Sequence, residues 1–129
     1  MPNYDTDRQY QACMQNFNVK EAEFCLTLYS NLDPEAAPQG KFIMSIIILS
    51  DYNYWAKLSK EQYSENRNMI AKELIKESEK IIPGLPHYIE QMEIATPLTM
   101  ERYTGNYKGA VYGWSQIVRQ SGIKRFSNR

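Results

Sequence analysis

Three consecutive isoleucines, Ile46 to Ile48, lie inside an almost unbroken apolar run from Phe42 to Leu49. β-Branched side chains lose rotamer freedom in a helix and are favoured in strands, so this run predicts a β-strand. Because nearly every position is apolar, we expect both faces of the strand to be covered. The run is far too short for a membrane-spanning helix, which needs about twenty apolar residues. Any fold of this chain must therefore place other elements around a short apolar strand.

A second strand is predicted over residues 23–30, which read Glu-Phe-Cys-Leu-Thr-Leu-Tyr-Ser. The ten residues 31–40 contain two prolines and end in a glycine, which indicates a loop long enough to return the chain antiparallel. Residues 88–95 predict a third strand, which Thr96-Pro97 ends. The sheet is therefore expected to have two or three strands.

The longest predicted helix covers residues 60–82. Ser59 and Gln62 have the spacing of a capping box, and Pro83-Gly84 ends the helix. We expect short helices within residues 5–17 and over residues 100–103, the latter with Thr99 as N-cap. The apolar stripe of the long helix comprises Ile70, Ala71, Leu74, Ile75, Ile81 and Ile82, and its solvated face comprises Glu73, Lys76, Glu77, Glu79 and Lys80.

Together these elements predict an α+β fold. It consists of a small antiparallel or mixed sheet of two to three strands packed by one long helix, followed by a glycine- and aromatic-rich C-terminal loop. With 129 residues, the chain is expected to form a single domain, and its tail, residues 124–129, is expected to fray. These few elements cannot cover the apolar strand on both edges and both faces. We therefore expect the chain to be part of something larger, or one half of an oligomer that associates through an exposed strand edge.

Charge and cysteine content exclude several classes of protein. Fifteen basic residues balance fifteen acidic ones, so no nucleic-acid partner is predicted. Two cysteines, Cys13 and Cys25, cannot form a disulfide framework, and we expect free thiols. The first five residues are polar and acidic, unlike a secretory signal, so a cytoplasmic location is predicted.

Side chains suited to catalysis are scarce. His87 is the single histidine, and a histidine beside a turn is more often structural than catalytic. No group of His, Cys and carboxylate residues has metal-ligand spacing, and no nucleotide-binding glycine motif occurs. We predict no catalytic residue and no metal site. A self-contained enzyme would depend on His87 or Cys25, and neither has an identifiable partner in the sequence.

Residues 95–114 are the most informative stretch. Gly105, Gly109 and Gly113 recur every four residues, and glycines permit positive φ or the close approach of a backbone to a ligand. Flat side chains with polar tips stand around them, together with one charge pair. These neighbours are Glu101, Arg102, Tyr103, Tyr107, Tyr112 and Trp114. The stretch is compatible with a backbone that approaches a flat aromatic or polyene-like partner, or with a loop that merely packs on the sheet.

This stretch also resembles a known family. The segments Thr-Pro-Leu-Thr-Met-Glu-Arg-Tyr-Thr-Gly-Asn at residues 96–106 and Gly-Ala-Val-Tyr-Gly-Trp at residues 109–114 resemble the C-terminal part of phytoene desaturase-like oxidoreductases. That group includes carotenoid desaturases, carotenoid isomerases and retinol saturases. The upstream pattern agrees, with Leu-Asp-Pro at residues 32–34 and Ala-Pro-Gln-Gly at residues 37–40. The resemblance covers nearly the whole chain.

The resemblance implies a flavin enzyme acting on polyenes. In that family an N-terminal Rossmann-type unit and a glycine-rich segment near the C-terminus bind FAD, and the region between them shapes an apolar tunnel. Both flavin-holding segments are missing here, which implies a fragment of the substrate-binding region. FAD is then expected in the parent enzyme and not in the isolated chain, which would be inactive. The residues implied for cofactor binding are Gly105, Asn106, Gly109, Tyr112 and Gly113, and those implied for substrate binding are Glu101, Arg102, Tyr103, Tyr107 and Trp114.

Three partners follow from this interpretation. They are the missing FAD-binding part of the parent chain, an apolar polyene substrate, and a second copy of this chain at the exposed strand edge. Because such substrates are lipids, the parent enzyme is expected to contact membranes peripherally. The alternative is a stand-alone module that binds an apolar ligand or another protein and has no redox activity.

Overall fold

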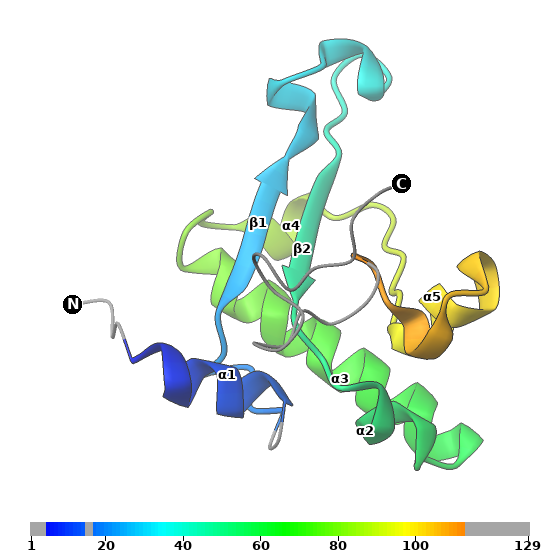
Figure 1. Cartoon of the computed structure of the whole chain (residues 1–129). Coiled ribbons are helices and arrows are strands. Elements are labelled where there is room, and N and C mark those ends of the chain that lie inside the picture. Colours follow the sequence, from blue (N-terminus) through cyan, green and yellow to red (C-terminus); the bar gives the residue numbers. More distant parts are fainter. Residues whose placement is uncertain (1–4, 15–16, 113–129) are drawn as a thin grey trace, which may run out of the picture.

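The computed structural model describes residues 5–14 and 17–112 (Figure 1). The secondary structure of these residues confirms the predicted α+β class, with one small antiparallel sheet and one long helix. In chain order the described elements are α1 (Thr6–Met14), β1 (Phe24–Leu28), η1 (Tyr29–Asn31), η2 (Pro34–Ala36), β2 (Met44–Ile48), α2 (Tyr52–Ala56), α3 (Lys60–Glu79), α4 (Leu85–Tyr88), α5 (Pro97–Thr104) and η3 (Tyr107–Gly109), where η denotes a short 3₁₀-helix.

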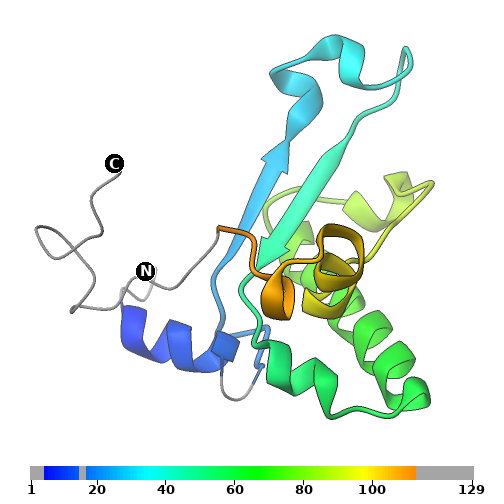
Figure 2. The ribbon, with the colours of Figure 1, turned by 45° about the vertical axis from the view of Figure 1, so that its right-hand side comes forward.

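β1 and β2 form the predicted antiparallel pair. Phe24 lies opposite Ile48 and Leu28 opposite Met44, so five residues of each strand are in register. Past the strand ends the Tyr29 N–H still donates to the Ile43 carbonyl (3.0 Å), and the Ile43 N–H donates to Ser30 Oγ (2.8 Å). The tip of this hairpin, which carries η1 and η2, projects away from the helices in both views (Figures 1 and 2).

The predicted third strand at residues 88–95 is wrong. The chain makes the short helix α4 as far as Tyr88, and residues 89–96 have no regular secondary structure. Gly84, with φ +79°, and Pro86 start a helical turn that the His87 N–H closes by donating to the Gly84 carbonyl (2.9 Å). Short apolar runs do not distinguish strand from helix or loop, so the local alternation misled the prediction.

The predicted capping box of α3 is confirmed, but the helix is shorter than expected. The Gln62 N–H donates to Ser59 Oγ (3.2 Å), and the Ser59 N–H donates to Gln62 Oε1 (3.0 Å). After Glu79 the Ile81 and Ile82 N–H groups both donate to the Ser78 carbonyl, which turns the chain out of the helix. Ile81 is consequently 65% exposed, and the fully buried Ser78 occupies the apolar stripe in its place.

Glu73 also departs from the prediction of a solvated face. Its side chain is half-buried, and one carboxylate oxygen is shielded from solvent and has no hydrogen-bond partner. Glu77 and Glu79 are half-buried as well, whereas Lys76 and Lys80 are exposed as expected.

The core is built around Trp55, which lies in α2, a helix the sequence did not predict. Trp55 packs with Val19, Ile70 and Leu74, and its Nε1–H donates to Ser50 Oγ (2.6 Å). Aromatic rings surround it, with centroid distances of 5.8 Å to Phe17, 5.2 Å to Tyr54 and 5.6 Å to Tyr63. The inner face of the sheet, through Phe24, Ile46 and Ile48, packs against this cluster.

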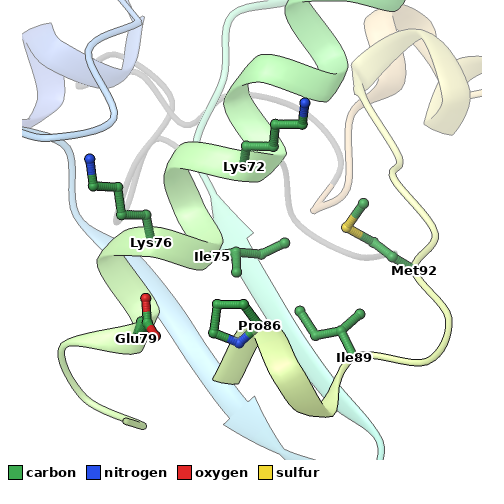
Figure 3. A pocket seen from close by; sticks show the side chains of 7 residues that line it. All are labelled: Lys72, Ile75, Lys76, Glu79, Pro86, Ile89 and Met92. Carbon is green, nitrogen blue, oxygen red and sulfur yellow. The ribbon is translucent and has the colours of Figure 1, made fainter. Parts of the chain in front are cut away.

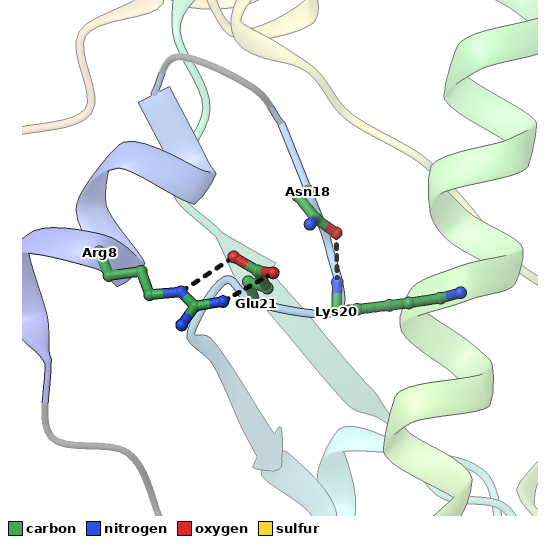
Figure 4. A network of polar contacts seen from close by, with 4 residues as sticks. All are labelled: Arg8, Asn18, Lys20 and Glu21. Atoms are coloured by element: carbon green, nitrogen blue, oxygen red, sulfur yellow. Dashed lines mark hydrogen bonds and ion pairs between the residues drawn. The ribbon is translucent and has the colours of Figure 1, made fainter.

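α1 confirms the short helix predicted within residues 5–17. An exposed ion pair with two hydrogen bonds joins it to Glu21 in the turn before β1 (Figure 4). The Arg8 guanidinium donates from Nε to Glu21 Oε2 (3.2 Å) and from a terminal nitrogen to Glu21 Oε1 (3.0 Å). These hydrogen bonds and the Arg8 charge lower the pKa of Glu21. Nearby, Asn18 Oδ1 accepts a hydrogen bond from the Lys20 N–H (3.3 Å) and fixes the turn that leads to Glu21.

The expectation that both faces of the apolar strand are covered is wrong within the described residues. Ile46 and Ile48 pack inward, but Ile47 between them is 53% exposed. Successive side chains of a strand point to opposite faces, and the described helices cover only the inner one. The predicted free thiols are confirmed, since Cys13 is buried and unpaired and Cys25 is exposed and unpaired.

Candidate functional site

The described residues that the sequence singled out lie on α5, on η3, between them or shortly after η3, and the two elements pack against each other. α5 begins at Pro97, earlier than predicted, and its N-cap is Thr96 rather than Thr99. Thr96 Oγ1 accepts from the Thr99 N–H (3.4 Å), and the Thr96 N–H donates to Thr99 Oγ1 (3.1 Å). The correction follows from Pro97, whose fixed φ and missing N–H suit the first turn of a helix.

Thr96 also fastens α5 to the long helix. Its side chain is buried, and its hydroxyl lies 3.0 Å from the hydroxyl of Tyr63 on α3. Burial raises the pKa of Tyr63, but its hydrogen bonds with Thr96 and Thr99 and the nearby Arg67 charge outweigh that effect, so the pKa is lowered overall. The candidate site is therefore held against the core of the molecule.

Gly105 and Gly109 each adopt a positive φ, for different structural reasons. Gly105, at φ +70°, ends α5 in the left-handed conformation, and its N–H donates to the Glu101 carbonyl (2.9 Å). Gly109, at φ +64°, is buried against α5, where a Cβ would lie 2.1 Å from the Pro97 carbonyl oxygen. Packing within the chain thus requires Gly109, and η3, the described part of the loop, packs on α5.

Glu101 is the polar centre of the site. Its Oε2 accepts a hydrogen bond from the Tyr52 hydroxyl (2.7 Å), and its Oε1 accepts one from the Lys108 N–H (3.1 Å). Lys108 has φ +52°, a conformation that non-glycine residues rarely adopt, and the bond to Glu101 supports it. The hydrogen bond to Glu101, together with desolvation and the Glu101 charge, raises the pKa of Tyr52. Glu101 therefore joins α2, α5 and η3.

The turn after α5 is closed by Asn106. Its side-chain Nδ2 donates to the Ala110 carbonyl (2.9 Å), and its backbone N–H donates to Thr104 Oγ1 (3.2 Å). Glu101, Asn106 and Gly109 thus act together to fix the backbone of residues 101–110.

The aromatic candidates lie on the outside of this unit. Tyr103, Tyr107 and Tyr112 are 78%, 69% and 98% exposed. The Arg102 guanidinium carbon lies 5.7 Å from the centre of the Tyr103 ring, and Lys108 Nζ lies 5.5 Å from that of Tyr107. In the described part of the chain no ring contact joins these three tyrosines, so they form an open surface. Gly113 and Trp114, like the tail at residues 124–129, lie outside the described residues.

A groove that the sequence did not indicate lies between α3 and the segment from α4 to Met92 (Figure 3). Its volume is about 380 Å³. Apolar side chains form its floor and charged side chains of α3 its rim; the lining residues are Lys72, Ile75, Lys76, Glu79, Pro86, Ile89 and Met92. The mistaken strand at residues 88–95 concealed it, because Ile89 and Met92 were assigned to a sheet.

The N-termini of α3 and α5 offer fewer free N–H groups to a phosphate than uncapped helices would. Helix N-termini bind phosphate through free N–H groups, but Ser59 and Thr96 cap the first turns of α3 and α5. The space beside Gly109 is filled by Pro97. Among residues 5–14 and 17–112, no three His, Cys, Asp or Glu side chains are placed to hold a metal ion, and no helix is long and apolar enough to span a bilayer.

Sequence comparison finds relatives among proteins named prolycopene isomerase. Prolycopene isomerase 2, chloroplastic, of an Oncidium hybrid cultivar is 32% identical over 113 residues, covering 84% of this chain. The corresponding protein of Daucus carota is 32% identical over 99 residues, or 76% of this chain, and that of Arabidopsis thaliana is 33% identical over 100 residues, or 77%. No family model and no solved structure matches the chain.

These matches cover only a small part of each relative. The aligned region is 19% of the Oncidium protein, 16% of the carrot protein and 17% of the Arabidopsis protein. The names of these relatives place them in the chloroplast, and the cytoplasmic location predicted from the sequence stays a prediction. The resemblance to carotenoid isomerases of the phytoene desaturase-like group is confirmed.

Proposed function

Because this chain is homologous to a segment of the prolycopene isomerases, we propose that it is the substrate-domain segment of a FAD-dependent oxidoreductase acting on a carotenoid- or retinoid-like polyene. The observation that carries the proposal is the alignment of 84% of this chain with only 19% of a prolycopene isomerase. A segment of that extent leaves the greater part of such an enzyme outside this chain, and we propose that the flavin-binding parts belong to that remainder.

The flavin would supply the redox chemistry, and this chain would supply positioned surfaces beside it. Glu101, Asn106 and Gly109 fix the α5–η3 backbone, so the exposed tyrosines are presented on a rigid support. Glu101, Arg102, Tyr103, Tyr107 and Trp114 are assigned to the substrate side, and Gly105, Asn106, Gly109, Tyr112 and Gly113 to the flavin side. Gly109 would act by placing the loop, because the position of its missing Cβ is occupied by Pro97.

The test is to isolate the native protein from source-cell extract with an antibody against α3. Flavin released by denaturation is then measured by fluorescence, and conversion of a carotenoid or retinoid by chromatography. We expect FAD and turnover in the native protein and neither in the isolated chain of 129 residues. Native protein without flavin, or turnover by the isolated chain, would contradict the proposal.

The groove favours a second candidate, the stand-alone module that binds an apolar ligand. Ile75, Pro86, Ile89 and Met92 give it an apolar floor. Titration of the isolated chain with a retinoid, followed by ligand fluorescence, would reveal binding. This candidate function predicts that Met92→Asp abolishes that binding and that Leu32→Ser, at a highly exposed position outside the groove, leaves it unchanged. Absence of binding by the unmodified chain would eliminate it.

A further inference from the structure

The β1–β2 sheet has one face that no described element covers. The register places Cys25 opposite Ile47 and Thr27 opposite Ser45 on this face, and we call these four residues the outer face. Cys25 and Ile47 are exposed and Thr27 and Ser45 are half-buried, while Ile43 and Leu49, which flank β2, are exposed as well. Ile43, Ile47 and Leu49 therefore leave apolar surface open to water along β2, and such surface marks a site where another surface binds.

The strands also lack the devices that protect free sheet edges in isolated domains. Natural edge strands carry charged residues or proline that prevent pairing with other chains. β1 reads Phe-Cys-Leu-Thr-Leu and β2 reads Met-Ser-Ile-Ile-Ile, so neither contains a charge or a proline. A two-stranded sheet is moreover marginal without further strands or a covering layer. The described strands therefore have the composition of interior strands of a larger structure.

We infer that the outer face is an internal interface that an apolar, uncharged segment of the same longer polypeptide covers. This inference rests on the proposed function. A charged partner is excluded because the four outer-face residues offer no countercharge, and a charge buried against Ile47 would be unpaired.

The length of the relatives favours a covering segment from the same polypeptide over one from a second copy of this chain. The aligned region is no more than 19% of the relatives compared, so most of their length could supply the covering segment. A segment of the same chain is also held at high effective concentration. Cys25 and Ile47 are exposed, which leaves this part of the outer face accessible to such a segment.

Two cysteines make the inference measurable. Cys25 lies on the outer face, whereas Cys13 is buried in α1. Burial also raises the pKa of the Cys13 thiol, which slows its reaction because the thiolate is the nucleophile. Tryptic cleavage separates them, since Cys13 lies in the peptide of residues 9–20 and Cys25 in that of residues 21–41.

The experiment labels the full-length polypeptide and the isolated chain with N-ethylmaleimide and measures both peptides by mass spectrometry. Cys25 is expected to react on the order of tenfold more slowly in the full-length polypeptide than in the isolated chain, while Cys13 stays slow in both. In the full-length polypeptide, Ile47→Lys is expected to restore fast labelling of Cys25. Met69→Lys, at an exposed apolar position on α3, serves as the matched control and should not.

Equal labelling of Cys25 in both proteins would overturn the inference, because the outer face would then be open. Slow labelling of Cys25 in the isolated chain would also overturn the inference. If labelling is slow at every protein concentration, this chain itself covers Cys25. If it is slow only at high protein concentration, a second copy of the chain covers it. Flavin is measured in the same full-length sample. If the full-length protein contains flavin but its Cys25 reacts quickly, the inference is refuted and the proposed function is not. If it lacks flavin but its Cys25 reacts slowly, the proposed function is refuted and the inference is not.

Discussion

The two faces of the hairpin differ although they are made of the same residue type. Ile46 and Ile48 pack against the Trp55 cluster, whereas Ile47 between them is exposed. The three isoleucines are equally apolar, so their surroundings and not their chemistry separate them. The inner face is stabilised by this chain, and the outer face lacks a partner among the described residues.

The tyrosines repeat this contrast. Tyr54 and Tyr63 pack on Trp55 and form hydrogen bonds with Asn66 and Thr96. Tyr103 and Tyr107 lie exposed on the α5–η3 unit, whose backbone is nevertheless held firmly. A rigid support that exposes aromatic side chains is expected where a further surface or ligand is bound.

Replacing Trp55, the centre of the core, should have the largest effect on the free energy of unfolding. Trp55→Ala removes a buried indole that contacts three other rings, and it should lower the free energy of unfolding by about 3–5 kcal/mol. Tyr112→Ala, on the exposed side, should change it by less than about 0.5 kcal/mol. Urea denaturation of the isolated chain measures both. Equal losses would mean that Trp55 is not the centre of the core.

Glycine substitutions test how firmly the α5–η3 unit is packed. Gly109→Ala places a methyl group against the Pro97 carbonyl at a positive φ, so it should cost more than about 2 kcal/mol. Gly105→Ala has a similar φ but nothing within 4 Å, so strain alone should cost about 1 kcal/mol. Denaturation curves of the two variants compare them directly. A loss at Gly105 as large as that at Gly109 would refute the tight contact with Pro97.

Adjacent isoleucines provide a sharper comparison of the two faces. Ile46→Ala should destabilise the isolated chain by about 2 kcal/mol, because Ile46 packs against the core cluster. Ile47→Ala should cost less than about 1 kcal/mol there, since its side chain is half exposed. Thermal unfolding followed by circular dichroism would show the difference. A reversed order would mean that the strand register is shifted by one residue.

The smallest effect concerns the polar centre. Glu101→Gln removes the charge that accepts the Tyr52 hydrogen bond, so the raised pKa of Tyr52 should fall toward the ordinary value of about 10. Tyr52 favours its protonated form in the folded state. The contribution of the Tyr52 hydroxyl to the free energy of unfolding is therefore fully present below a pH of about 10, and it is lost as the pH rises through the pKa that Tyr52 has in the folded state. NMR titration of ¹³C-labelled tyrosine measures the shift, and an unchanged Tyr52 pKa in the variant would show that Glu101 does not hold it.

The sequence predicted those parts of the fold that local chemistry determines. The Ser59–Gln62 capping box and the pairing of two strand-forming runs were correct, because each depends on neighbouring residues or on a strong β preference. The strand at residues 88–95 was wrong, since α4 takes up the chain as far as Tyr88 and residues 89–96 have no regular secondary structure. α2 was missed because its five residues gain their stability from packing Trp55 into the core.

The candidate site was predicted in its residues but not in its construction. The glycine and tyrosine pattern pointed to residues 95–114, and within the described part of that stretch α5 and η3 form one packed unit. The bond between Tyr52 and Glu101 spans 49 positions, and the groove depends on α4, so neither was visible in the sequence. Long-range contacts of this kind depend on tertiary packing, which local patterns do not encode.

The central claim, that this chain is one segment of a larger carotenoid-type enzyme, is tested most directly by the mass of the native polypeptide that contains it. Source-cell proteins are separated by size under denaturing conditions, and the tryptic peptide of residues 81–102 is located by mass spectrometry. The account predicts this peptide in a polypeptide several times larger than 15.1 kDa. Its recovery only at 15.1 kDa would contradict the account and leave the stand-alone binding module as the explanation.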